Sequence, residues 1–299
     1  MKPCLFIHTN RKQHLGALVS AYSMRRASKH ADAFDVRLIQ AEDHAFLAEH
    51  EGQRYLRDGS WRAWKNDDLQ SFTPLRFLPP ELMGYQGRAA VIDPDIFAIA
   101  DPWQLLARDM GQHAILCRRR SGAKGRSCFA SSVMLLDCAK LRHWRAAEDF
   151  QELFDGERDY GDWICLRREP AGSIGPLEPE WNDFDRLTPN TKLLHNTRRW
   201  TQPWKTGLPV DFVPGEKLYG IPFGSLLMRL RRQVFGEHGL LGRYLRHPDR
   251  NQERFFFGLL RECVDRKIVT EEMLRDEMRQ NHIRHDAFEV LEKTPPLAA

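Results

Sequence analysis

The feature that most constrains the fold is the apolar run at 89–92, followed directly by Asp93, Pro94 and Asp95. An uninterrupted apolar run of this kind is typical of a strand buried on both faces of a parallel sheet. Ligands of such sheets gather beyond the carboxyl ends of the strands. Because residues i and i+2 of an extended segment point to the same side, Asp93 and Asp95 can face one ligand together. Pro94 between them limits the backbone freedom of the turn.

The two carboxylates allow two interpretations. Carboxylates held close together repel each other unless a cation or a shared proton lies between them. A hard divalent metal is the natural partner, and such metals are often held by one or two carboxylates together with substrate phosphates. The alternative is a strand that ends in an acidic turn containing proline. Taken alone the stretch favours the acidic turn, so the rest of the chain has to decide.

Composition and charge limit the class of protein. The chain has 299 residues, 42% hydrophobic and 29% charged, which predicts a substantial core in one large α/β domain or two smaller ones. The net charge of +4 is too mild to indicate a nucleic-acid partner. The six cysteines form no C-x-x-C pair and mostly lie in apolar runs, which predicts reduced, buried thiols. With no signal-peptide pattern and no apolar stretch of the roughly 18–20 residues that a bilayer requires, we expect a cytoplasmic protein.

The first part of the chain predicts the start of a nucleotide-binding sheet. Its expected elements are a strand at 4–7, a helix at 15–28, a strand at 34–40, a charged helical region at 42–70 and a short helix at 75–77. Trp61 and Trp64 of the charged region are expected to cover the core. The first strand ends at His8, Thr9 and Asn10, where polar side chains are well placed to touch a ligand. No G-x-G-x-x-G or G-K-[ST] pattern follows, so neither a dinucleotide fingerprint nor a P-loop is supported.

The middle of the chain alternates strands and helices. We expect a helix capped by Asp101 at 101–106, strands at 114–117 and 129–136, helices at 147–154 and 159–163, and a strand at 192–195. A basic loop is predicted between the strands at 114–117 and 129–136, with Arg118, Arg119, Arg120, Lys124 and Arg126. It is either a solvated loop or a lid or docking patch for an anionic acceptor or a lipid surface.

From about residue 206 the chain becomes helical and basic. A basic amphipathic helix is predicted at 226–235, a second basic helical stretch contains Arg243, Tyr244 and Arg246, and two charged helices are expected within 250–292. Such a basic amphipathic surface either docks on anionic lipid or packs on the preceding domain. The sequence leaves both open, the first implying a peripheral contact with the inner face of the membrane through 226–246. We predict two domains, 1–205 and 206–299.

Several stretches, taken in order, resemble family 8 of the glycosyltransferases, which use nucleotide-sugar donors. The resemblance covers roughly residues 4–205. Its motifs are the G-A-L-V-S-A-Y-S helix at 16–23, Arg76, the D-x-D motif Asp93-Pro94-Asp95, the run 96–103, the apolar strand 129–136, the pair Trp181-Asn182, and His195 with Pro203-Trp204. The D-x-D motif by itself is weak, whereas this many motifs in the right order are fairly specific.

The resemblance implies an α/β fold of GT-A type, with a mixed, mostly parallel sheet flanked by helices and a C-terminal helical extension. It implies that Asp93, Asp95 and His195 bind Mn²⁺, or Mg²⁺ in its place, which holds the diphosphate of a UDP-sugar. A set of carboxylate oxygens and one imidazole nitrogen suits Mn²⁺ better than Ca²⁺. The other residues implied in nucleotide-sugar binding are His8, Thr9, Asn10, Arg76, Pro94, Gln202, Trp204 and Lys205. Asp162 is the carboxylate expected near the sugar, with a catalytic role.

The chain departs from the family pattern at Ala130, Gly161 and Gln202. Lys205, Arg198 or Arg199 is expected to supply the positive charge that the family takes from a lysine at the position of Gln202. The predicted function is a metal-dependent, retaining transfer of sugar from a UDP-sugar to a glycan or glycolipid precursor. One alternative is a catalytically inactive GT-A-fold binding or scaffold protein. A nucleotidyltransferase is less favoured because no glycine-rich phosphate loop follows the first strand.

Overall fold

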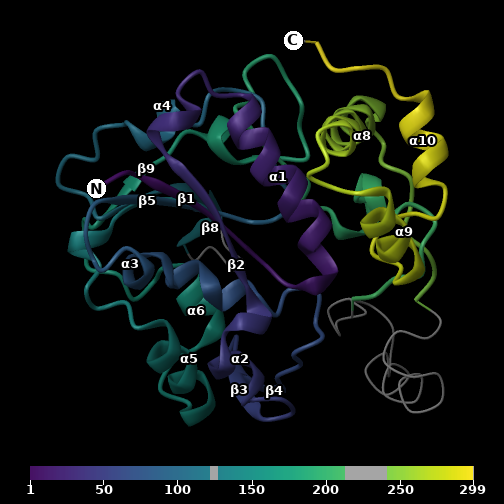
Figure 1. Cartoon of the computed structure of the whole chain (residues 1–299). Helices are drawn as coiled ribbons and strands as arrows, with labels where there is room; N and C mark the ends of the chain where they lie inside the picture. Colours follow the sequence, from purple (N-terminus) through teal and green to yellow (C-terminus); the bar gives the residue numbers. More distant parts are fainter. Residues whose placement is uncertain (122–126, 213–240, 299) are drawn as a thin grey trace. The chain divides into compact units, whose positions relative to one another are not determined.

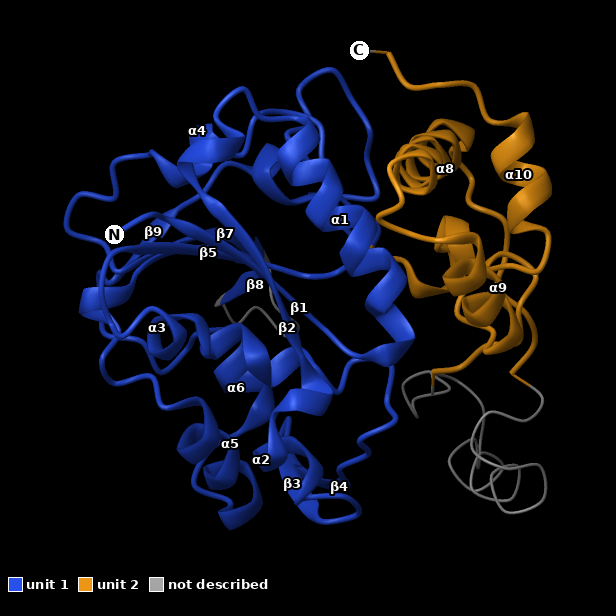
Figure 2. Cartoon of the chain, in the orientation of Figure 1, with its two compact units in different colours: residues 1–196 blue, residues 197–299 orange. Residues whose placement is uncertain are grey.

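The computed structural model describes residues 1–121, 127–212 and 241–298. The chain divides into two compact units, Met1–Asn196 and Thr197–Ala299 (Figure 2). This division falls earlier in the chain than the predicted boundary after residue 205, and the assignment of the catalytic domain to 1–205 stays a prediction. Each unit is described by itself.

Unit 1 contains the predicted mixed sheet, in the order β2-β1-β5-β8-β7-β9. Strands β2, β1 and β5 run parallel, β8 is antiparallel to both β5 and β7, and β9 is parallel to β7. The mainly parallel α/β class predicted from the sequence is therefore confirmed. The strands are β1 (Cys4–Thr9), β2 (Asp35–Gln40), β5 (Arg88–Ile92), β7 (Ile115–Ser121), β8 (Ser127–Asp137) and β9 (Ile174–Pro176).

Helices cover both faces of this sheet, which explains the uninterrupted apolar runs of its strands (Figure 1). Cys4 and Phe6 of β1 pack in one cluster with residues of α5 (Ala146–Asp155) and α6 (Tyr160–Ile164). Leu5 and Ile7 pack on the opposite face with residues of α1 (His14–Arg26). Because neighbouring side chains of a strand point to opposite faces, both sets must be apolar. Other helices of unit 1 are α2 (Ala45–Ala48), α3 (Pro79–Leu82) and α4 (Trp103–Leu106), with 3₁₀ turns at Arg11–Gln13, Ala31–Ala33, Ala41–Asp43, Thr73–Phe77, Cys138–Lys140 and Pro179–Asn182.

A second, three-stranded sheet carries the residues of the predicted site. Its order is β10-β11-β6, formed by β10 (Asp183–Phe184), β11 (Leu193–His195) and β6 (Ile96–Ala98). Strand β6 runs antiparallel to β11, and His195 pairs with Ile96. This register places His195 opposite the residue that directly follows Asp95.

The helical prediction for residues 42–70 is confirmed only at the short helix α2 and is wrong beyond it. After the short helix α2, the chain forms a hairpin of β3 (Arg54–Arg57) and β4 (Ser60–Ala63). Asp58 and Gly59 turn it with φ angles of 51° and 72°. An Asp-Gly pair is a strong hairpin signal because both central residues of the turn need positive φ. Trp64 is buried as expected, whereas Trp61 is 44% exposed on the hairpin.

The prediction of a basic loop after residue 117 is also partly wrong. Arg118, Arg119 and Arg120 belong to β7, which extends to Ser121 and pairs with β8. The Arg118 guanidinium lies 4.2 Å from the centre of the Phe184 ring and donates to the carbonyl of Asn182. Arg119 and Arg120 keep exposed side chains while their backbone pairs with β8, so their charges remain solvated within the strand. Lys124 and Arg126 lie outside the described residues.

The expectation of reduced thiols fails at one pair of cysteines. Cys128, in β8, and Cys165, directly after α6, form a disulfide across 37 positions of sequence. The pairing follows from the tertiary fold, which lays the end of α6 beside β8, and sequence spacing carried no sign of it. Free, buried thiols remain at Cys4, Cys117, Cys138 and Cys263.

Unit 2 is helical, with one more helix in its last part than the sequence predicted. The helices are α8 (Arg250–Asp265), α9 (Glu271–Arg279) and α10 (Ala287–Lys293), with 3₁₀ turns at Arg199–Thr201 and Pro203–Lys205. The predicted amphipathic helix at 226–235 lies outside the described residues. The basic stretch around Arg243 and Tyr244 is not helical: Arg243 forms an isolated bridge with Pro209, and Tyr244 is buried. Within the described parts of the chain, every helix is too short or too polar to cross a bilayer.

Candidate metal and donor site

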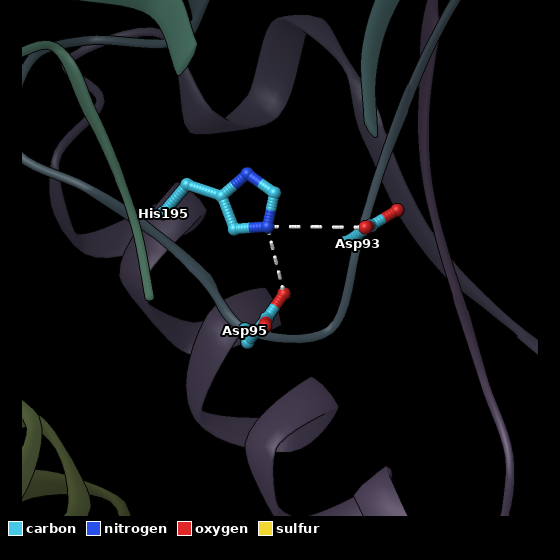
Figure 3. A group of neighbouring side chains, drawn as sticks. All are labelled: Asp93, Asp95 and His195. Carbon is cyan, nitrogen blue, oxygen red and sulfur yellow. Dashed lines mark ion pairs between the residues drawn. The ribbon is translucent and has the colours of Figure 1, made fainter. Parts of the chain in front are cut away.

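Three predicted metal ligands meet where β5 ends and β11 ends. Asp93 and Asp95 lie in the turn between β5 and β6, and His195 closes β11 (Figure 3). Nε2 of His195 lies 3.2 Å from Oδ1 of Asp95 and 3.8 Å from Oδ2 of Asp93. A hundred residues of sequence separate the histidine from the carboxylates, so this meeting is set by the pairing of β6 with β11.

Small residues of α1 hold the acidic turn in place. A Cβ atom on Gly16 would lie 3.1 Å from the carbonyl oxygen of Pro94, so the helix approaches the turn closely at this glycine. Ser20 donates to the carbonyl of Ile96 at 2.5 Å, and Ser23 accepts from the backbone N–H of Ala98 at 3.0 Å. The G-A-L-V-S-A-Y-S helix thus contributes to the site by fixing the backbone on both sides of Asp95.

A second layer of contacts orients His195. Its Nδ1 lies 2.8 Å from Oδ1 of Asn182, and Nδ2 of Asn182 donates to Oγ of Ser132 at 2.9 Å. Asn182 and the ring of His195 are both buried. Since the amide oxygen can only accept, it keeps a proton on Nδ1 and leaves Nε2 as the ring nitrogen that faces the carboxylates. Such an outer partner is typical of histidines that bind metals.

Asp93 is engaged by cationic and polar side chains. The Nε of Arg76 donates to Oδ1 at 2.9 Å and its Nη2 to Oδ2 at 2.5 Å, a bidentate pair. Nε2 of His8, at the end of β1, lies 3.0 Å from Oδ1. The Nη1 of Arg76 donates to Oγ of Ser131 at 3.1 Å. The Arg76 side chain is nine-tenths buried, so this guanidinium belongs to the site and not to the surface.

The charges of the cluster shift its pKa values in different directions. Burial acts to raise the pKa of Asp93, but Arg76 and the two histidines outweigh it and hold that pKa well below its usual range. Burial acts to lower the pKa of His195, yet Asp95 and Asp93 bring it above its ordinary value. For His8 burial prevails over the attraction of Asp93, and its pKa falls. At neutral pH Asp93 is therefore ionised and His8 is neutral.

The donor set fits a divalent cation. Asp93, Asp95 and His195 each offer one ligand atom, and these atoms all lie within 4.8 Å of one another. Two carboxylate oxygens and one imidazole nitrogen match the preferences of Mn²⁺, and the oxygens those of Mg²⁺. The described residues therefore provide the three predicted ligands in mutual reach.

The three residues at the end of β1 differ in what they contact. Nδ1 of His8 is buried without a hydrogen-bond partner in the described part of the chain, which leaves its lone pair for a ligand. Thr9 donates to the carbonyl of Asn10. The Asn10 amide donates to Ser71 at 3.0 Å, and its oxygen accepts from the N–H of Gln13 at 3.2 Å. Of the three, His8 has the side chain that adjoins Asp93.

The predicted catalytic residue, Asp162, lies on α6. It forms an ion pair with Arg167, and its carboxylate is 41% exposed. The C-terminal turn of α6 is linked to the cluster because Ser131, which accepts from Arg76, donates to the carbonyl of Ile164 at 2.7 Å. This chain of hydrogen bonds connects α6 with Asp93, while the catalytic role of Asp162 stays a prediction.

The departure at Gly161 has a local structural reason. The Asp58 carboxylate, at the tip of the β3–β4 hairpin, would lie 2.5 Å from a Cβ atom at this position. Asp159 holds hairpin and helix together, since it accepts from the N–H groups of Gly59 at 2.9 Å and Gly161 at 2.7 Å. The hairpin thus fills the space that a longer side chain at 161 would occupy.

Gln202, Trp204 and Lys205 belong to unit 2. Lys205 is fully buried, and its Nζ donates to Asp211 at 2.9 Å and to the carbonyl of Asn281 at 3.3 Å. The Trp204 ring lies 4.6 Å from the ring of Phe256, measured between centres. These contacts serve the packing of unit 2, and the donor-binding role of the three residues stays a prediction.

Two contributors to the site were missed from the sequence. The pair Trp181-Asn182 is one of the motifs of the family resemblance, but no role was predicted for it. In the structure Asn182 orients His195. Ser131 stands beside the departure at Ala130 and binds Arg76. The sequence signal for Ser131 was its hydroxyl, a polar group within a predicted apolar strand.

Comparisons with known proteins place the chain near glycosyltransferases in structure alone. No protein-family model and no curated protein sequence matches it. A crystal structure of galactosyltransferase LgtC with donor and acceptor sugar analogues is 14% identical, with a TM-score of 0.47, over 67% of this chain and 89% of that one. Glycosyltransferase GlyE of Streptococcus pneumoniae TIGR4 is 15% identical, with a TM-score of 0.46, over 90% of this chain and 64% of that one. Mouse xyloside xylosyltransferase 1 is 14% identical, with a TM-score of 0.43, over 66% of this chain and 98% of that one.

Proposed function

We propose that the chain is a metal-dependent, retaining glycosyltransferase of GT-A type that moves a sugar from a UDP-sugar to a glycan or glycolipid precursor. The observation that carries the proposal is the meeting of Asp93, Asp95 and His195 at the strand ends. Charge near the ends of parallel strands is typical of ligand sites in open α/β sheets. The order of motifs in the sequence, which resembles family 8, supports the same activity.

The side chains of the cluster suggest a division of labour. Asp93, Asp95 and His195 would hold Mn²⁺ or Mg²⁺, which when bound neutralises charge on the departing diphosphate. Asn182 holds Nδ1 of His195, so Nε2 faces the carboxylates and can bind the cation once it has lost its proton. Arg76 offers a planar guanidinium that suits a phosphate oxygen pair. Burial of Arg76 and Asp93 keeps water away, so these charges act in a medium of low dielectric constant.

The sugar side of the site is assigned to α6. We propose that Asp162 lies beside the transferred sugar, with Arg167 as its ion-pair partner before the donor arrives. The acceptor is proposed to be a glycan or glycolipid, and the location the cytoplasm, with a peripheral contact at the inner face of the membrane through 226–246. Residues 226–240 of that segment lie outside the described structure.

The direct test is calorimetry of UDP with Mn²⁺, followed by a screen of UDP-sugars for hydrolysis and transfer. Wild-type protein is expected to bind UDP only weakly without Mn²⁺ and at least about tenfold more tightly with it. Asp95→Ala should remove this dependence on metal. Unchanged UDP–Mn²⁺ binding in Asp95→Ala would contradict the site assignment.

A second candidate is a binding or scaffold protein that keeps the fold and the cation site without catalysis. It is favoured by the state of α6, where Asp58 fills the space beside Gly161 and Arg167 pairs with Asp162. Such a protein would bind UDP with Mn²⁺ and release no free sugar from any donor. Hydrolysis or transfer of a single nucleotide sugar, lost in Asp162→Asn, would reject it.

A further inference from the structure

Arg76 occupies both oxygens of a carboxylate that the proposed cation needs. Its Nε and Nη2 donate to Oδ1 and Oδ2 of Asp93 at 2.9 and 2.5 Å, and His8 adds a third contact at 3.0 Å. Asp93 is buried, so its charge is balanced by these neighbours and not by water. A cation that takes an oxygen of Asp93 therefore competes with Arg76 for the charge and the lone pairs of this carboxylate.

Charge repulsion acts in the same direction. A divalent cation bound to Asp93 would lie close to the guanidinium, in a buried cluster where like charges interact strongly. Two carboxylates cannot neutralise a divalent cation and Arg76 together, so the loaded cluster has a surplus of positive charge. A diphosphate supplies the missing negative charge.

Arg76 also has an anchor that does not depend on Asp93. Its Nη1 donates to Oγ of Ser131 at 3.1 Å, and that hydroxyl donates onward to the carbonyl of Ile164 at 2.7 Å. With one nitrogen held by β8, the other two donors can change partner by a small rotation of the side chain. The planar, always charged guanidinium accepts a phosphate oxygen pair as readily as a carboxylate.

We propose that Arg76 is a built-in counter-ion that holds Asp93 while the site is empty and exchanges Asp93 for the diphosphate when the cation binds. Cation and nucleoside diphosphate then bind cooperatively, each weakening the hold of Arg76 on Asp93 in favour of the other. The inference rests on the proposed function, since it assumes that a cation and a diphosphate share this site. It adds that Arg76 opposes the cation in the absence of nucleotide, the reverse of a purely supporting role.

The experiment measures Mn²⁺ binding by calorimetry and by the electron paramagnetic resonance of free Mn²⁺, with and without saturating UDP. In wild-type protein UDP is expected to tighten Mn²⁺ binding about 10- to 100-fold, and Mn²⁺ should tighten UDP binding by the same factor. Arg76→Gln should bind Mn²⁺ alone at least about fivefold more tightly than wild type, because competitor and repulsion are both gone. Its coupling factor should fall below about threefold.

Two further variants keep the test decisive if Arg76→Gln does not fold. Arg76→Lys keeps the charge but loses the bidentate pair with Asp93, and Ser131→Ala removes only the hydroxyl that anchors Arg76. In the absence of UDP, both variants should bind Mn²⁺ more tightly than wild type, though less tightly than Arg76→Gln. Arg108→Gln is the matched control, because Arg108 pairs with Glu178 at the surface. It should leave both affinities unchanged.

The outcomes separate the inference from the function on which it rests. If wild-type protein binds neither Mn²⁺ nor UDP–Mn²⁺, the proposed function fails. If wild-type protein binds UDP–Mn²⁺ but folded Arg76 and Ser131 variants bind Mn²⁺ alone no more tightly, with the coupling unchanged, the counter-ion role is overturned and the function stands.

Discussion

Unit 1 has two pairs of carboxylates that lie close together in sequence, and the pairs differ in the groups that bind them. Asp93 and Asp95, one residue apart, contact charged or chargeable side chains: Arg76 and the two histidines. Asp159, on the other hand, accepts from backbone N–H groups of the hairpin turn and of α6. Its neighbour Asp162 is paired with an arginine at the partly exposed surface.

The difference lies in whether the partners can be exchanged. A backbone N–H that binds Asp159 cannot leave without unwinding the turn or the helix that provides it. The side chains around Asp93 can rotate, and His195 can lose a proton, so another cation can take their place. An acidic pair is a ligand site where its partners are exchangeable and a structural cap where they are not. The following changes test this distinction.

The largest effect is expected for His195→Ala. Outer partners of metal ligands are worth about 10- to 100-fold in affinity, so loss of a ligand should weaken Mn²⁺ binding by more than about 100-fold. Calorimetry with UDP present measures it. His143→Ala, at an exposed histidine that pairs with Glu169, is the control and should bind as wild type does. Equal losses in both variants would show that the strand-end cluster is no special site.

Next in size is Asn182→Ala, which leaves all three ligands in place. Without the amide oxygen, Nδ1 of His195 loses its partner and the ring loses its tautomer and orientation. Mn²⁺ affinity should fall about 10- to 100-fold, with thermal melting to confirm that the variant is folded. Asn190→Ala, at an exposed position nearby in sequence, serves as the control. Wild-type Mn²⁺ affinity in Asn182→Ala would refute the orienting role.

Asp159→Ala should show the opposite profile. The loss of a helix cap costs about 1–2 kcal/mol of unfolding free energy, and the hairpin loses its tie to α6 as well. Mn²⁺ affinity should stay within about twofold of wild type, because none of the ligands moves. Urea unfolding and calorimetry measure the two quantities. Asp155→Ala, at the exposed end of α5, should change stability by less than about 0.5 kcal/mol. A large loss of Mn²⁺ binding in Asp159→Ala would break the proposed distinction.

The smallest effect concerns acid. Burial acts to raise the pKa of Asp159, but backbone N–H groups of Gly59, Asp58, Gly161 and Asp162 outweigh it and lower that pKa from its ordinary value of 3.8. A carboxylate with a depressed pKa stabilises the fold above its unfolded value and loses that contribution as pH falls through the folded pKa. The stability difference between wild type and Asp159→Ala should be constant above about pH 5 and shrink below about pH 4. If the stability difference grew as the pH fell, the pKa of Asp159 would be raised in the folded protein, which would contradict the prediction.

Much of the fold and part of the site were predictable because they follow from local rules. Continuous apolar strands give a sheet covered on both faces, and the order of motifs selects His195 as the third ligand. Contacts between residues far apart in the sequence could not be predicted. The charges at 42–70 suggested a helix, although Asp58-Gly59 was a turn signal that deserved more weight. Nothing in the spacing of Arg76 from Asp93 indicates a bidentate pair, since that geometry depends on how the 3₁₀ turn at Thr73–Phe77 packs.

Because of the Cys128–Cys165 disulfide, the stability of the purified protein depends on whether a thiol reductant was present. It encloses α5 and α6 in one covalent loop, with a sequence separation of 37. In the chain-entropy view a loop of this size restricts the unfolded chain enough to add roughly 4 kcal/mol to the free energy of unfolding. Protein purified with a thiol reductant and protein purified without it are thus two materials, with different melting temperatures and different freedom at Asp162. A comparison of UDP–Mn²⁺ binding by the two forms measures how far this covalent loop affects the site.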